Sequence, residues 1–207
     1  VDIGGGTTEI AVLSLGGIVA GRSIKLGGDR LDEAIAAHLR VQRGFAIGER
    51  TAESLKISHG YYGRPVGRPP VIVPGQDLRK LGPGTLEVRE EVIGAAIAEP
   101  IGQIVDAIRA VIEQTPPELV RDLGERGLVL AGGGAAIAGL APTLSHVLSI
   151  PARVADEPLL CVALGAGAIL GDRRLFDALY PAPQSLIGRW WRFLRSGMRE
   201  SSSYSSR

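Results

Sequence analysis

Two glycine-rich segments give the clearest signs of chemistry in this sequence. The first is Asp2-Ile3-Gly4-Gly5-Gly6-Thr7-Thr8, which follows the predicted end of a strand, and the second is Gly132-Gly133-Gly134-Ala135, between a predicted buried strand and a helix. Glycine permits backbone angles and close approaches that side chains forbid, so successive N–H groups can face one phosphate or a nucleoside. A single glycine triplet can equally be a tight turn, and the pattern alone leaves both interpretations open.

Asp2 is a candidate metal partner beside the first glycine run. It stands two residues before that run, at the expected end of a strand. A carboxylate in this position can hold a hydrated divalent cation next to phosphate oxygens. The spacing therefore favours a phosphate site with a cation.

Other polar residues have more ordinary explanations. His38, His59 and His146 show no clear partner spacing, which favours packing or solvent roles over metal ligation. Glu53 and Lys56 are three positions apart on a predicted helix, so both side chains can leave one helix face, as they would in an exposed ion pair.

The surrounding elements indicate an α/β protein. Residues 8–15 and 18–26 are rich in β-forming residues and predict two strands of a hairpin. An apolar stripe at helical spacing predicts a helix from about residue 28 to residue 43, and a shorter helix is expected over residues 48–59.

The middle of the chain predicts a small sheet and then a long helix. Short strands are expected at residues 71–73 and 86–88, with a turn-rich stretch between them. Isoleucines repeating at spacings of three and four predict a helix over residues 90–115, which we expect Pro100 to split or restart. Residues 128–130 are wholly apolar, as in a strand buried on both faces.

Composition excludes several classes of protein. The chain has 207 residues, 45% hydrophobic and 22% charged, which is enough to bury the core of one large domain or two small ones. Its single cysteine, Cys161, excludes an internal disulfide framework, and no apolar run reaches the roughly 18–20 residues of a membrane span. We expect a cytoplasmic protein, and the opening at Val1 without a methionine predicts a fragment.

Charge is unevenly distributed, because residues 1–188 carry 18 basic and 21 acidic residues while residues 189–207 carry five arginines and one glutamate. On a helix the segment Arg189-Trp190-Trp191-Arg192-Phe193-Leu194-Arg195 would separate its arginines from Trp190, Phe193 and Leu194. This pattern predicts either contact with an anionic membrane surface or a terminal helix docked on its own domain. A nucleic-acid partner is not expected, since basic residues form no other patch.

Several of these motifs resemble, in the same order, those of the MreB family of bacterial actin-like proteins. The resemblance covers roughly residues 1–172 and rests on Asp2–Thr8, Ser23–Ile35, Gly48–Lys56, Leu86–Glu90, Thr115–Leu119, Leu130–Ala135 and Asp156–Gly165. It implies an actin-like ATPase fold of the ribonuclease H-like kind, with two α/β halves around a nucleotide cleft, of which this chain is the second. The lobe would comprise residues 1–48 and 89–180, an inserted α+β subdomain residues 49–88, and a linker and tail residues 181–207.

The resemblance also implies a site for ATP and Mg²⁺. The first loop would contact the β- and γ-phosphates, Asp2 would reach the magnesium through water, the helix with Glu53 and Lys56 would reach the adenosine, and the second loop would pass under the nucleoside. The implied nucleotide-binding residues are Gly4, Gly5, Gly6, Thr7, Glu53, Ser54, Leu55, Lys56, Gly132, Gly133, Gly134 and Ala135. No residue is assigned as catalytic, because the first phosphate loop and the acidic residue that positions water belong to the family's first half. The slow ATPase of the intact family is therefore not assigned to these residues alone.

The family's role implies ATP-dependent filaments at the inner membrane face that guide peptidoglycan synthesis and rod shape. The implied partners are further copies of the chain, the cell-wall synthesis machinery and the membrane surface, the last through Arg189, Trp190, Arg192, Phe193, Leu194 and Arg195. A sugar or metabolite kinase of the same superfamily is the alternative, although no carboxylate is convincingly placed for a sugar. A chaperone ATPase would need a larger inserted subdomain.

Overall fold

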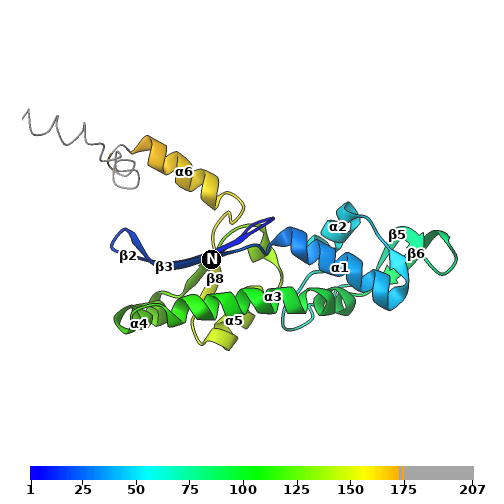
Figure 1. The fold of residues 1–207 in the computed structure, drawn as a ribbon, viewed down its shortest axis with the longest axis horizontal. Coiled ribbons are helices and arrows are strands. Elements are labelled where there is room, and N and C mark those ends of the chain that lie inside the picture. The colour runs from blue at the N-terminus through cyan, green and yellow to red at the C-terminus, as the bar shows by residue number, and fades with distance from the viewer. Residues whose placement is uncertain (173, 175–207) are drawn as a thin grey trace, which may run out of the picture. The chain divides into compact units, whose positions relative to one another are not determined.

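A computed structural model of the chain describes residues 1–172 and 174 (Figure 1). The chain divides into two compact units, Val1–Cys161 and Val162–Arg207. The helix α6 (Cys161–Gly171) begins at this boundary, and the fold below is that of the first unit. The predicted linker and basic tail, residues 181–207, lie outside the described residues.

A mixed sheet forms the centre of the first unit. Its strands are β1 (Asp2–Ile3), β2 (Thr8–Ser14), β3 (Gly17–Ile24), β7 (Leu128–Leu130) and β8 (Ala152–Val154). The first three are antiparallel neighbours, which confirms the predicted hairpin, and β7 and β8 are parallel. The backbone of residues 1–3 bonds to that of residues 129–131, with the Ala131 N–H 2.8 Å from the Val1 carbonyl. The sheet therefore runs in the order β3-β2-β1-β7-β8.

Two helices carry long buried apolar stripes and pack against each other. The helix α1 (Gly28–Arg43) buries Leu31, Ile35 and Leu39, as its stripe predicts. The helix α3 (Glu90–Glu113) buries its isoleucine stripe and runs alongside β2, β3 and α1 (Figure 1). The expectation that Pro100 splits this helix is wrong. Pro100 lies buried in an unbroken helix, where packing of the apolar face outweighs the one helical hydrogen bond that proline cannot donate.

The remaining elements of the lobe are short. They are α4 (Pro117–Arg126), the 3₁₀ turn η1 (Gly133–Ala136) and α5 (Leu140–Leu148). Among the described helices, none combines the length and the hydropathy that a bilayer-spanning segment requires.

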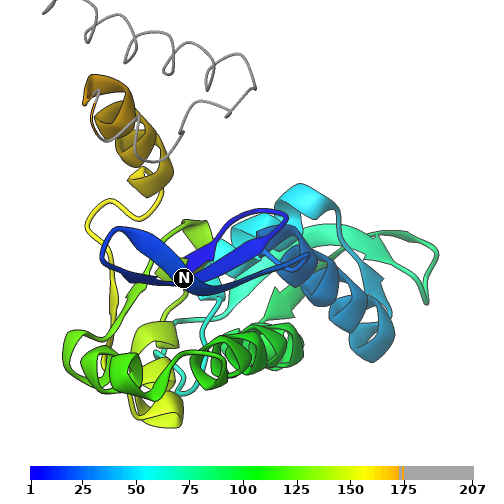
Figure 2. The same cartoon turned by 60° about the vertical axis from the view of Figure 1, so that its left-hand side comes forward.

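Residues 45–88, called the inserted segment from here on, form one helix and a three-stranded sheet beside it (Figure 2). These elements are α2 (Glu49–His59), β4 (Phe45–Ala46), β5 (Val71–Asp77) and β6 (Gly82–Val88). The strands β5 and β6 are longer than predicted, since the ladder continues through Gly75↔Gly84. A Cβ on Gly75 would lie 2.5 Å from the Phe45 ring, so this glycine is required for β4 to pack on the hairpin. The sheet thus takes in residues 45–46, just before the segment 49–88.

Candidate functional site

The fold brings the two glycine loops together. The strands β1 and β7 are parallel neighbours, and the Ile3 N–H donates to the Ala131 carbonyl at 2.8 Å. Because parallel neighbouring strands end at the same edge of a sheet, the loops that follow them lie side by side. The segments starting at Gly4 and Gly132 thus form one site from opposite ends of the sequence.

The second loop fits tightly against the strand that carries Asp2. A Cβ on Gly132, whose φ is +79°, would lie 2.3 Å from the Asp2 Oδ1 atom and 2.3 Å from the Ile3 carbonyl oxygen. A Cβ on Gly134 would lie 2.2 Å from the Ile3 side chain. Both glycines are therefore required by the contact between the loops, whereas Gly133 is exposed and its Cβ would meet only the end of Leu159, at 3.3 Å.

The first loop presents backbone donors to its surroundings. The Gly4 N–H donates to the Thr7 carbonyl at 2.9 Å and closes a tight turn, and residues 5–7 are exposed. In the described part of the chain, the N–H groups of Gly5, Gly6 and Thr7 donate to no acceptor. Neighbouring backbone donors of this kind are the groups that bind anions in other proteins.

The beginning of α1 holds this loop in place. The Gly28 and Asp29 N–H groups donate to the Gly4 and Gly5 carbonyls, each at 2.9 Å. Thr8, which is fully buried, donates its hydroxyl to the Leu26 carbonyl at 2.6 Å. The Gly4 and Gly5 carbonyls are thereby occupied by α1, whereas the exposed residues 5–7 keep their N–H groups toward solvent.

Asp29 also brings a carboxylate to the loop that sequence reasoning did not assign. A Cβ on Gly5 would lie 3.4 Å from the Asp29 Oδ1 atom. In the sequence, Asp29 follows Gly27-Gly28 at the start of the helix, a context typical of a helix cap. Together with Asp2, this residue places two carboxylates near the anion site.

The four residues of α2 that were predicted to bind the nucleotide differ in how far they are exposed. Glu53 and Ser54 are exposed, while the Leu55 side chain is 2% exposed and packs in the core. Lys56 is 14% exposed, and its Nζ atom lies 2.6 Å from Asp32 Oδ2 and 3.0 Å from the Gly28 carbonyl. The interpretation of Glu53 and Lys56 as an exposed ion pair is therefore wrong, because Lys56 pairs with a buried carboxylate of α1.

The carboxyl group of Asp32 is buried and lies near other carboxylates. Burial raises the pKa of the Asp32 carboxyl above its usual range, against the opposing hydrogen bond and charge of Lys56, and the carboxylates of Glu53 and Asp29 raise it further. The Oδ1 atom of Asp32 is buried and has no hydrogen-bond partner within the described residues. This carboxyl is therefore held by one strong interaction on one oxygen.

No three His, Cys, Asp or Glu side chains cluster as metal ligands in residues 1–172. Of the three histidines, the buried His59 contacts the Ser58 hydroxyl at 2.8 Å and the Pro69 carbonyl at 3.1 Å. That histidine has a packing role, as its sequence context predicts.

The sheet order and the paired loops define an α/β actin-like ATPase fold. The crystal structure of MreB5 of Spiroplasma citri bound to ADP matches with a TM-score of 0.81 and 30% identity, over 87% of this chain and 54% of that one. The MamK double helical filament matches with a TM-score of 0.65 and 21% identity, over 76% of this chain and 49% of that one, which supports the fold alone.

The chain belongs to the MreB/Mbl protein family, whose sequence model matches residues 1–177. The cell shape-determining protein MreB of Escherichia coli (strain K12) is 45% identical over 172 residues, 82% of this chain and 49% of the relative. The cell shape-determining protein Mbl of Bacillus subtilis (strain 168) is 41% identical over 172 residues, 83% of this chain and 52% of the relative. The resemblance to the family is confirmed, and the chain spans about half the length of these relatives.

Proposed function

We propose that this chain provides one half of an ATP site in a filament-forming cell-shape protein. The proposal rests on the N–H groups of Gly5, Gly6 and Thr7, which have no acceptor among the described residues and lie beside the second glycine loop. Backbone donors of this kind bind phosphate oxygens without any side chain. The S. citri relative was solved with ADP and with AMPPNP, which supports a nucleoside polyphosphate as the ligand.

Different residues of the proposed site would contact different parts of the nucleotide. Gly4 through Thr7 would hold the β- and γ-phosphates, and Asp2 would bind water of the associated Mg²⁺. The second loop, Gly132 to Ala135, would lie under the nucleoside, where the exposed Gly133 leaves room for close approach. On α2, the exposed Glu53 and Ser54 are the side chains free to meet the adenosine.

The same chain would bind the nucleotide without completing its hydrolysis. The family's water-positioning acid lies in its other half, and the proposal gives none of the described residues that role. Hydrolysis is accordingly a property of the two halves together.

Filament formation would use the two ends of the first unit. The β2–β3 turn exposes Leu13, Leu15 and Ile18, and the β5–β6 hairpin exposes Ile72 and Leu81 at the opposite end (Figure 1). A contact between different surfaces of identical copies generates an open filament when the rotation from copy to copy does not close into a ring. A role in cell shape is in the names of the cell shape-determining relatives. The proposal places such filaments at the inner membrane face, where they would guide peptidoglycan synthesis.

Binding of a fluorescent ATP analogue tests the site directly. A Cβ on Gly6 would have only an Asp29 oxygen nearby, at 3.9 Å, so Gly6→Val should fold normally yet obstruct a phosphate. We expect its affinity for Mg·ATP to fall at least about tenfold. Gly102→Val, at an open position on α3, is the matched control. If neither the chain nor a form carrying the first half of the E. coli relative binds ATP, the proposed site is wrong.

A further inference from the structure

A continuous set of contacts joins the phosphate loop to the inserted segment. The peptide N–H of Gly28 donates to the Gly4 carbonyl at 2.9 Å, and the carbonyl of the same residue accepts from Lys56 Nζ at 3.0 Å. Lys56 belongs to α2, the helix of the inserted segment. A single residue of α1 thus contacts the phosphate loop on one side and the inserted segment on the other.

Asp32 determines where the lysine ammonium lies. Its Oδ2 atom is 2.6 Å from Lys56 Nζ, and the two side chains are 7% and 14% exposed. Asp32 is one helical turn beyond Gly28, so the carboxylate and the Gly28 carbonyl present two acceptors to one ammonium group. Without this carboxylate, the flexible Lys56 side chain would no longer be held against the Gly28 carbonyl.

Stability alone is a poor explanation for this pair. Burying two opposite charges costs desolvation that their attraction often fails to recover, and a pair of apolar residues is frequently as stable. The cost is visible at Asp32 Oδ1, which is buried without a hydrogen-bond partner among the described residues. What the pair provides is a fixed geometry between α1 and α2.

We propose that Asp32 is a positioning residue: through Lys56 and Gly28 it transmits the state of the phosphate loop to α2 and the inserted segment. The ligand side of this inference rests on the proposed nucleotide site. The contact between the helices, by contrast, requires no ligand and can be measured without one.

Amide exchange at individual residues tests the proposal. Without nucleotide, Asp32→Asn should make the Gly28 and Asp29 amides exchange about tenfold faster, because their contact with the loop loses its support. With Mg·ATP, the wild-type chain should gain protection in the loop and in residues 49–59, whereas D32N should gain it in the loop alone. Glu33→Gln is the matched control, since it breaks only the exposed Arg30–Glu33 pair one position further along α1.

A double variant guards against general destabilisation. Asp32→Asn leaves a buried ammonium group without its partner and can weaken the whole fold, but D32N/K56M removes both charges at similar volume. We expect the double variant to recover the melting temperature of the wild type while its α2 amides stay insensitive to ATP. The proposal is overturned if D32N changes neither exchange at Gly28 and Asp29 nor the response of α2. A wild-type chain with no protection in the loop on adding ATP would contradict the nucleotide site instead, and the exchange without nucleotide would still decide the role of Asp32.

Discussion

Gly132 lies so close to Asp2 that a single methyl group at its α-carbon would fall 2.3 Å from the Asp2 Oδ1 atom. The two residues are 130 positions apart in the sequence, and their contact aligns the second glycine loop with the first. The site therefore depends on a steric fit between two loops as much as on the groups that would touch a ligand.

Gly132→Ala should destabilise the fold by roughly 2–4 kcal/mol, because the new methyl group collides with β1 and the left-handed backbone strains any other residue. Urea unfolding measures the change. Gly133→Ala, one position later, is the control: its methyl group meets only the flexible end of Leu159, and it should cost less than about 1 kcal/mol. Equal losses in both variants would contradict the steric argument.

Acid should release the loop of residues 61–70 through Glu90. Burial alone would raise the pKa of this carboxyl, but the hydrogen bond that it accepts from the Gly67 N–H, together with the nearby backbone N–H groups of Arg68 and Val66, holds it below its usual value of 4.5. The native protein therefore binds fewer protons at Glu90 than the unfolded chain does, so this stabilisation is complete above that usual value and is lost as the pH falls through the native pKa.

Urea unfolding of the wild type and of Glu90→Gln at a series of pH values tests this dependence. The variant should be less stable at pH 7, and the difference should shrink as the pH falls below about 4. Glu91→Gln, at the exposed neighbouring position, should behave like the wild type throughout. A difference between Glu90→Gln and the wild type that persists unchanged into acid would exclude the carboxylate as the cause.

Leu15→Asp should prevent assembly while leaving nucleotide binding intact. Leu15 is fully exposed at the β2–β3 turn, so the charge costs little in the monomer and opposes an apolar contact between copies. Sedimentation with and without ATP, in the form carrying the first half of the E. coli relative, is the measurement. Val66→Asp, exposed in the loop of residues 61–70, is the control. A protein that never pellets and turns over ATP only with a sugar would instead be a kinase.

Deleting residues 189–207 should weaken binding to anionic vesicles. The arginines and aromatic residues of this segment suit a negatively charged lipid surface, where each arginine contributes about 1 kcal/mol. Flotation with vesicles of phosphatidylglycerol and phosphatidylethanolamine compares the two forms, with neutral phosphatidylcholine vesicles as the control. Equal flotation of both forms would rule out a membrane role for the tail.

Local patterns in the sequence predict the helices and the hairpin well, since apolar spacing and glycine pairs act within a few residues. The continuity of α3 through Pro100 could not be predicted, because the packing that keeps this helix unbroken comes from β2, β3 and α1. Likewise, Gly75 is typical of a turn in the sequence. Only the structure shows that it lies in a strand, where Phe45 packs against it.

The candidate site is likewise only partly predictable from local sequence patterns. Its glycine loops are evident in the sequence, and their adjacency follows once β1 and β7 are known to be parallel neighbours. The partner of Lys56 is different, because Asp32 is 24 positions away on another helix and no spacing rule connects them. Glu53, at helical distance, was the natural partner to expect.

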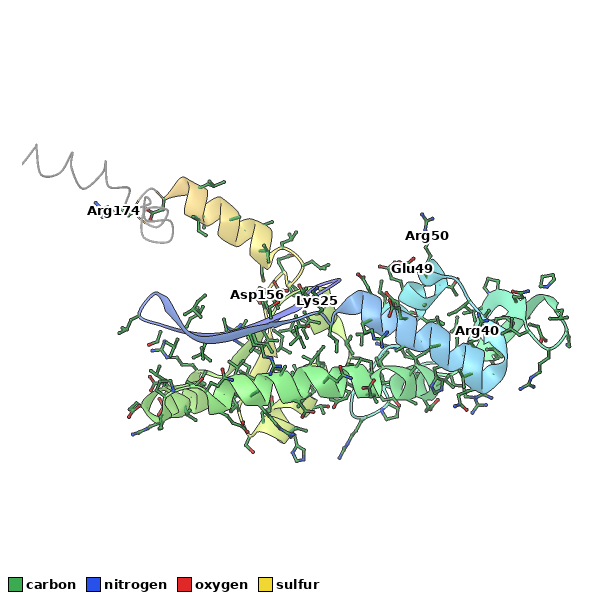
Figure 3. All side chains as sticks on the ribbon, viewed as in Figure 1. Lys25, Arg40, Glu49, Arg50, Asp156 and Arg174 are labelled. Atoms are coloured by element: carbon green, nitrogen blue, oxygen red, sulfur yellow. The ribbon has the colours of Figure 1, made fainter. Side chains whose placement is uncertain are left out.

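The placement of α1 has a mechanical consequence. Its first residues bond to the phosphate loop, and Phe45, just beyond its last turn, forms β4 in the sheet of the inserted segment. Figure 3 shows Arg40 toward that far end of the helix and Glu49 and Arg50 at the start of α2. At 1.5 Å per residue, this 16-residue helix is about 24 Å long. If α1 tilted by about 5° at the loop, its far end would move by about 2 Å. A small rearrangement of the loop would therefore displace the sheet of the inserted segment.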